Sequence, residues 1–130
     1  MILDSSAIVA IALDEPERAT FVERINLAET VAVAAPTLVE AGIVLSARTG
    51  ADAASLLSEM MTAADAVVIG FGAEHWQAAI SAWWRFGRSR HPAALNFGDC
   101  LAYAAAKVAG EPLLAKGDDL PQTDIELART

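Results

Sequence analysis

Short runs of aliphatic and β-branched residues alternate along this chain with longer segments in which apolar residues recur every three or four positions. The first pattern is typical of buried strands and the second of amphipathic helices. Strands are predicted at residues 1–3, 30–35, 66–69 and 112–115, with a possible last strand at 125–127. Helices are predicted at residues 5–13, 16–28, 37–49, 51–64, 73–86 and 96–108. Strands that alternate with helices pair in parallel, so the sequence predicts an α/β fold with a helix-flanked parallel sheet.

The predicted helix at 73–86 carries a stripe of large apolar residues, Trp76, Ile80 and Trp83, with Trp84 beside it. The helical spacing favours a face turned toward the core over a platform for stacking RNA bases. One of the tryptophans could still face a partner. Cys100, within an apolar helix, is expected in the core.

Composition narrows the class of protein. The chain has 130 residues, a size typical of one domain, so residues 1–130 are predicted to form a single domain. Hydrophobic residues make up 55%, which suggests that some apolar surface is left for a partner. A net charge of -8 argues against a protein that coats nucleic acid nonspecifically. One cysteine and no apolar run of about 20 residues predict a cytoplasmic protein without a membrane span.

Acidic residues occur at four places where a strand ends or a helix begins: Asp4, Glu40, Asp99 and Asp118-Asp119. A parallel sheet would bring these places to one edge. Carboxylates in one cleft repel each other and raise each other's pKa, so a cation is expected among them. Oxygen ligands alone indicate Mg²⁺ or Mn²⁺, and such an ion suits the hydrolysis of a phosphodiester.

The order of these motifs resembles a PIN-domain ribonuclease of the VapC toxin type. The resemblance rests on Ile2-Leu3-Asp4-Ser5-Ser6-Ala7, Thr37-Leu38-Val39-Glu40, Asn96-Phe97-Gly98-Asp99-Cys100 and Lys116-Gly117-Asp118-Asp119-Leu120. It implies a PIN-like three-layer fold and a Mg²⁺-dependent endoribonuclease that cuts structured RNA such as tRNA or rRNA. It also implies inhibition by a VapB-type antitoxin and assembly as a homodimer or as a hetero-oligomer with that antitoxin.

The resemblance also assigns roles to residues. Asp4 and Asp99 correspond to the principal metal ligands, assisted by Glu40, and Ser6 corresponds to the small hydroxyl residue beside the first Asp. Asn96 stands close to Asp99 in the same motif. The fourth acid stays open between Asp118 and Asp119, with Asp124 as a further candidate, because Gly117 and Leu120 depart from the common pattern.

A basic cluster, Arg85, Arg88, Arg90 and His91, precedes the Asn96 motif. The three arginines, with Lys116, are candidates for holding RNA phosphates. A solvated loop explains the cluster equally well.

Other interpretations fit parts of the pattern. Thr37-x-x-Glu40 is also a capping box, and Asp99 with Asn96 could cap a helix. A set of helix caps would make the chain a binding module without metal. The main alternative is a phosphoryl-transfer or receiver-like domain in which a strand-end Asp accepts phosphate and Lys116 contacts it. The third predicted strand argues against this, because it ends at Ile69-Gly70-Phe71 without an acceptor Asp.

Overall fold

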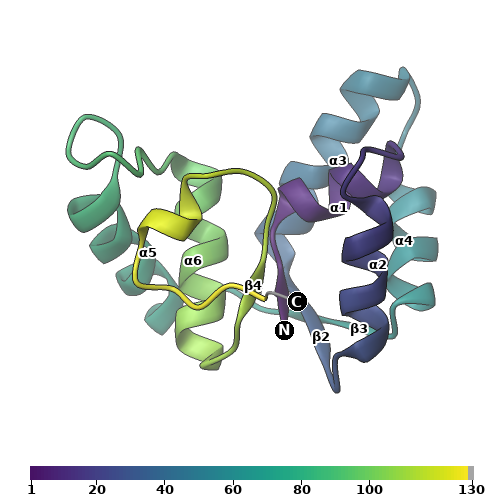
Figure 1. The fold of residues 1–130 in the computed structure, drawn as a ribbon. Coiled ribbons are helices and arrows are strands. Elements are labelled where there is room, and N and C mark those ends of the chain that lie inside the picture. The colour runs from purple at the N-terminus through teal and green to yellow at the C-terminus, as the bar shows by residue number, and fades with distance from the viewer. Residues whose placement is uncertain (129–130) are drawn as a thin grey trace.

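The computed structural model describes residues 1–128 and contains one four-stranded sheet in the order β3-β2-β1-β4 (Figure 1). All neighbouring strands are parallel, as the alternating pattern predicts. The strands are β1 (Ile2–Leu3), β2 (Val31–Ala34), β3 (Ala66–Ile69) and β4 (Leu113–Leu114). Because β1 lies between β2 and β4, the residue after β1 stands in the middle of the carboxyl edge of the sheet.

Within residues 1–128, six α-helices and one short 3-10 helix surround this sheet. They are α1 (Ser5–Ala12), α2 (Arg18–Leu27), α3 (Ala35–Thr49), α4 (Ala54–Ala63), α5 (Ala73–Phe86), α6 (Phe97–Ala109) and η1 (Leu120–Gln122). In the part of the chain that the structure covers, no helix combines the length and apolar character that crossing a bilayer requires.

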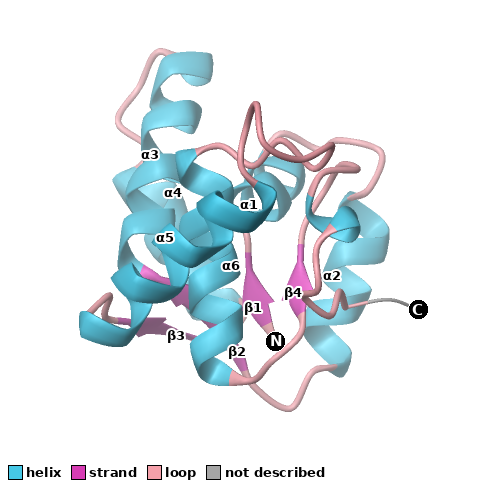
Figure 2. Ribbon diagram, turned by 90° about the vertical axis from the view of Figure 1, so that its left-hand side faces the viewer, coloured by secondary structure: helices cyan, strands magenta, loops and turns pink. Residues whose placement is uncertain are grey.

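The two faces of the sheet bury separate hydrophobic cores, since successive strand residues point to opposite faces. Leu3 and Val33 belong to a core shared with the first four helices. Ile2 and Leu113 belong to a second core, which is closed by α5 and α6 and contains Cys100, as expected. Figures 1 and 2 show the sheet between these two helical layers. The α/β fold with three layers is therefore confirmed.

Several element ends differ from the prediction. The bounds of β3 and α5 agree with it. Helix α2 begins at Arg18, two residues after Pro16, and α4 begins at Ala54, whose N–H is bound by the Asp52 carboxylate. The predicted strand at 125–127 is wrong, because only Leu127 forms an isolated parallel bridge, with Leu113.

The expectation that the tryptophan stripe faces the core is also wrong. Trp76 is 52% exposed, Ile80 60% and Trp83 44%. The opposite side of α5 packs against the second core through Ala79, Ala82 and Phe86. Small residues let the helix approach α6 closely, so the bulky residues are left on the solvent side.

Candidate active site

Asp4 lies directly after β1 and is almost completely buried, with 3% of its surface exposed. It caps α1: its Oδ2 accepts hydrogen bonds from the backbone N–H and the hydroxyl of Ser6. The Ser6 hydroxyl oxygen accepts in turn from the backbone N–H of Lys116, at 2.9 Å. Asp4 Oδ1 has no hydrogen-bond partner within the described chain. One oxygen of this carboxylate is thus fixed and the other is free.

Asp99 lies in the first turn of α6, at the same end of the sheet. Its Oδ2 accepts from the Asn96 backbone N–H at 3.0 Å, and the Asn96 side chain accepts from the Asp99 N–H at 2.9 Å. This reciprocal capping box fixes the start of the helix. The cap that the sequence suggested is therefore real, and it also holds the Asp99 carboxylate in place.

Glu40 does not form the capping box with Thr37 that the sequence offers as an alternative interpretation. Helix α3 already begins at Ala35, so Glu40 lies in its second turn, and the buried Thr37 hydroxyl has no hydrogen-bond partner among residues 1–128. The Glu40 carboxylate instead rests on Gly98: a Cβ atom at Gly98 would lie 1.9 Å from Glu40 Oε2. Sequence reasoning missed the role of Gly98, although a glycine in the first turn of a helix is a detectable signal, since glycine weakens helices.

The three candidates for the fourth acid have different surroundings. Asp118 and Asp119 are exposed in the segment between β4 and η1. The charge of Asp119 contributes to the raised pKa of Asp99, so Asp119 is electrostatically part of the site. Asp124 is engaged elsewhere, because it accepts hydrogen bonds from Tyr103, Arg85 and Lys107.

Burial and mutual repulsion perturb the acids that the fold brings together. Burial raises the pKa of Asp4 to about 6; the hydrogen bonds from Ser6 oppose this increase, and the charges of Asp99 and Glu40 add to it. Burial is also the largest cause of the raised pKa of Asp99, and Asp119 and Glu40 add to it. A cation would relieve this repulsion.

The residues at this edge fit a hard divalent ion by their chemistry, since they offer carboxylate oxygens, one of them buried and free of hydrogen bonds. Within residues 1–128, however, no three His, Cys, Asp or Glu side chains stand close enough together to count as a formed set of metal ligands. Mg²⁺ usually keeps several water ligands, so an ion shared by these acids would contact some of them through water, unless the side chains move closer together.

The predicted basic residues fall into two groups. Arg85 is paired with Asp124 at 3.2 Å, and Lys116 with Glu15 at 3.3 Å and Glu17 at 3.4 Å. Arg88 and Arg90 are exposed and form no ion pair with a carboxylate of residues 1–128.

Comparison with known proteins shows the family of this chain. The sequence matches the PIN domain family over residues 1–126. It is 44% identical to Ribonuclease VapC36 of Mycobacterium tuberculosis over 127 residues, which cover 97% of this chain and 91% of that protein. It is 40% identical to Ribonuclease VapC28 of the same species over 129 residues, or 98% of this chain and 97% of that protein.

Solved structures share the fold at low sequence identity. The crystal structure of VapC20 of Mycobacterium tuberculosis, a sarcin-ricin loop cleaving toxin, gives a TM-score of 0.76 at 17% identity, with 95% of each chain covered. A toxin-antitoxin complex from Klebsiella pneumoniae gives 0.69 at 12% identity, with 95% of this chain and 92% of that chain covered. The chain therefore belongs to the PIN domain family, and within it to the VapC ribonuclease toxins. It is a ribonuclease, as the resemblance implies.

Proposed function

We propose that this ribonuclease is an endonuclease that depends on Mg²⁺ or Mn²⁺ held by Asp4, Asp99 and Glu40. The observation that carries the proposal is the buried carboxylate of Asp4, which has one free oxygen and a pKa of about 6. A buried acid beside two other acids costs free energy unless a cation offsets its charge. Such an ion, when bound, supplies positive charge to the scissile phosphodiester and promotes ionisation of water.

The chain's own residues orient this site. Ser6 holds Oδ2 of Asp4, which leaves Oδ1 for the ion, and Asn96 holds the Asp99 carboxylate. Gly98 leaves room for the Glu40 carboxylate next to Asp99. We propose Asp119, rather than Asp118 or Asp124, as the fourth acid, because its charge acts on Asp99 while Asp124 is held by an ion-pair network.

The proposed substrate is structured RNA such as tRNA or rRNA, which places the activity in the cytoplasm. VapC20, which shares the fold, is a sarcin-ricin loop cleaving toxin.

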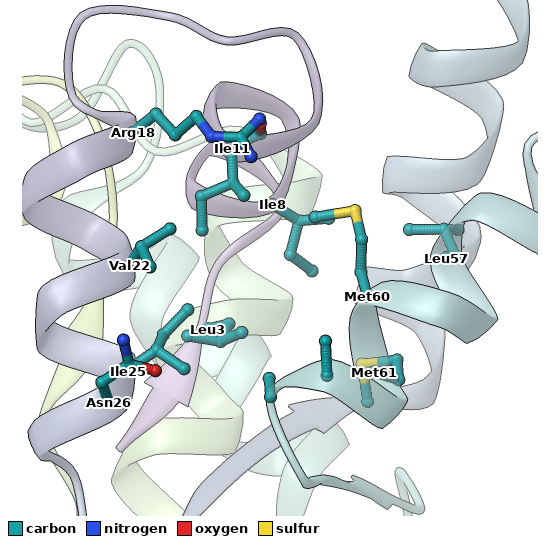
Figure 3. A pocket seen from close by; sticks show the side chains of 12 residues that line it. Leu3, Ile8, Ile11, Arg18, Val22, Ile25, Asn26, Leu57, Met60 and Met61 are labelled. Carbon is teal, nitrogen blue, oxygen red and sulfur yellow. The ribbon is translucent and has the colours of Figure 1, made fainter.

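The proposed protein partner is a VapB-type antitoxin, in a hetero-oligomer or beside a homodimer. A similar fold occurs in the toxin-antitoxin complex from Klebsiella pneumoniae. An apolar cavity of about 320 Å³ opens between α1, α2 and α4 (Figure 3). Its lining includes Ile11, Val22, Ile25, Met60 and Met61, with Arg18 at one end. We propose that an apolar segment of the antitoxin fills it, because adaptable methionine side chains suit such a contact.

The phosphoryl-transfer alternative has lost its support. Lys116, which would contact the phosphate in that alternative, is paired with Glu15 and Glu17. The chain also belongs to a ribonuclease family.

The test is cleavage of total RNA by the purified chain, with the new ends mapped. We expect a few discrete ends with Mg²⁺ or Mn²⁺, none with excess chelator, and none from Asp99→Asn. Cleavage that survives exhaustive chelation would remove the metal from the account.

A further inference from the structure

Two of the exposed arginines lie in the segment that links α5 to α6. Three of the nine Lys and Arg residues fall between positions 85 and 90, and Arg85 is paired with Asp124. Arg88 and Arg90 have no carboxylate partner within residues 1–128. In a protein of net charge -8, two arginines two positions apart that lack a carboxylate partner give this segment a local positive charge, which attracts anions.

Arg90 is also held against exposed aromatic rings. Its Cζ lies 3.7 Å from the ring centroid of Trp84 and 5.1 Å from that of Trp83, and its Nε donates to the Trp84 carbonyl at 3.0 Å. Trp84 is 64% exposed and Trp83 44%. Arg24 and Arg48 also lack a carboxylate partner within residues 1–128, but no cation-π contact accompanies them there. Within residues 1–128, only the segment after α5 joins cations without a carboxylate partner to an aromatic surface.

Backbone hydrogen bonds hold this segment in one conformation. Leu95 N–H donates to the Phe86 carbonyl and Arg88 N–H to the Leu95 carbonyl, both at 3.0 Å. Ser89 and Ala94 adopt positive φ angles of 67° and 51°, which cost free energy for residues with side chains. Gly87 is needed at the turn, since a Cβ there would lie 2.3 Å from the Trp83 carbonyl oxygen. The arginines are thus presented by an ordered loop.

The loop leads directly to the acidic site. Leu95 is hydrogen-bonded to Arg88 and stands four residues before Asp99. The Cα atoms of Leu95 and Asp99 are therefore at most about 15 Å apart. Figure 1 shows the segment after α5 at the same end of the molecule as the start of α1, which Asp4 caps. A short stretch of RNA can therefore reach from one to the other.

We propose that Trp84 and Arg90, together with Trp83 and Arg88, form a platform that holds an unpaired stretch of the RNA substrate next to the acids. The arginines bind phosphates, and the indole rings stack against bases. The inference rests on the proposed function for the identity of the ligand. We favour RNA over a protein partner because Arg88 and Arg90 have no carboxylate partner within residues 1–128 and lie in the segment that leads to the acids, where phosphates of the substrate would pass.

The experiment measures binding of labelled bulk tRNA by filter retention over a series of salt concentrations, with all variants made in Asp99→Asn so that the RNA stays intact. Replacing Arg88 and Arg90 by Gln should weaken binding and lower the slope of log K against log salt by about 1 to 1.5, since each phosphate contact contributes about 0.7. Trp84→Ala should weaken binding roughly 5- to 100-fold, and Trp84→Phe should retain most of the affinity.

The matched control is Arg24→Gln, which removes one charge near Met1 and Thr30, at the amino ends of the strands. The platform is wrong if the platform variants bind tRNA with the affinity and salt slope of this control, or if the parent binds no tRNA. It is also wrong if Trp84→Ala changes only the sedimentation of the chain, which would make the surface an interface between two copies. Metal-dependent cleavage with unchanged tRNA binding leaves the proposed function standing without the platform. Metal-independent cleavage with weakened tRNA binding leaves the platform standing without the proposed metal.

Discussion

The Glu40 carboxylate in α3 rests against the backbone of Gly98 in α6, so closely that a Cβ atom at position 98 would lie 1.9 Å from Glu40 Oε2. Gly98 directly precedes Asp99. The contact therefore brings an acid from the helix after β2 next to the acid at the start of α6. Glycine leaves the space that the carboxylate occupies in this contact, and the backbone conformation at position 98 does not itself demand glycine.

Gly98→Ala should separate activity from stability. The added Cβ meets the flexible end of Glu40, which can move aside, and alanine favours a helix over glycine by up to about 1 kcal/mol. The variant should melt no lower than wild type, yet cleave RNA on the order of 100-fold more slowly because a carboxylate is displaced. The control is Gly42→Ala, the same glycine-to-alanine change in a different helix, α3, and this variant should keep its activity. Full activity of Gly98→Ala would show that the position of Glu40 is unimportant.

The pKa of Asp4 predicts a pH dependence of stability in the absence of metal. Burial raises this pKa from 3.8 to about 6 in the folded protein. A raised folded-state pKa contributes stability that is complete below the unfolded value and lost as the pH rises through the folded value. Wild type should therefore lose on the order of 3 kcal/mol relative to Asp4→Asn between about pH 4 and pH 7. Denaturant unfolding of both proteins in chelator measures this difference, and a constant difference across the range would refute the assigned environment of Asp4.

The cavity in Figure 3 predicts how a partner is held. Val22→Asp puts a charge into apolar surroundings and should abolish co-purification with the antitoxin, whereas Val22→Ala should only weaken it. Circular dichroism melting would check that both variants fold. If Val22→Asp still binds the antitoxin as tightly as wild type, the partner lies on another surface.

Much of the fold follows from local sequence pattern. The β-branched run of β3 and the helical spacing of α5 place both elements at their observed bounds. The sequence predicts that Asp4 and Asp99 share an edge of the sheet. Asp4 follows a strand and Asp99 lies in the first turn of a helix, and in a parallel sheet both positions fall at the carboxyl ends of the strands. This topological argument needs no side-chain detail. The prediction of one domain over residues 1–130 stays a prediction.

Features set by tertiary packing could not be predicted. Periodicity identifies the tryptophan stripe on α5, but it cannot tell that Ala82 on the other side is the residue packed against α6. Whether Asp118 or Asp119 acts on the charge of Asp99 depends on the path of the exposed loop that carries both residues. The contact of Glu40 with Gly98 joins residues 58 positions apart, and only the assembled helices reveal it.

The most direct test of the metal site is the effect of Mg²⁺ on thermal unfolding of wild type, Asp4→Asn and Asp99→Asn. An ion that binds only the folded chain adds about 2.7 kcal/mol at 100 times Kd, which should raise the Tm of wild type by roughly 10 °C. The two Asn variants should lose most of this rise, whereas Asp124→Asn, an acid held by Arg85 and Lys107, should keep it. If wild type shows no rise even at tens of millimolar Mg²⁺, or if both site variants show the full rise, the acids at this edge do not form a metal site.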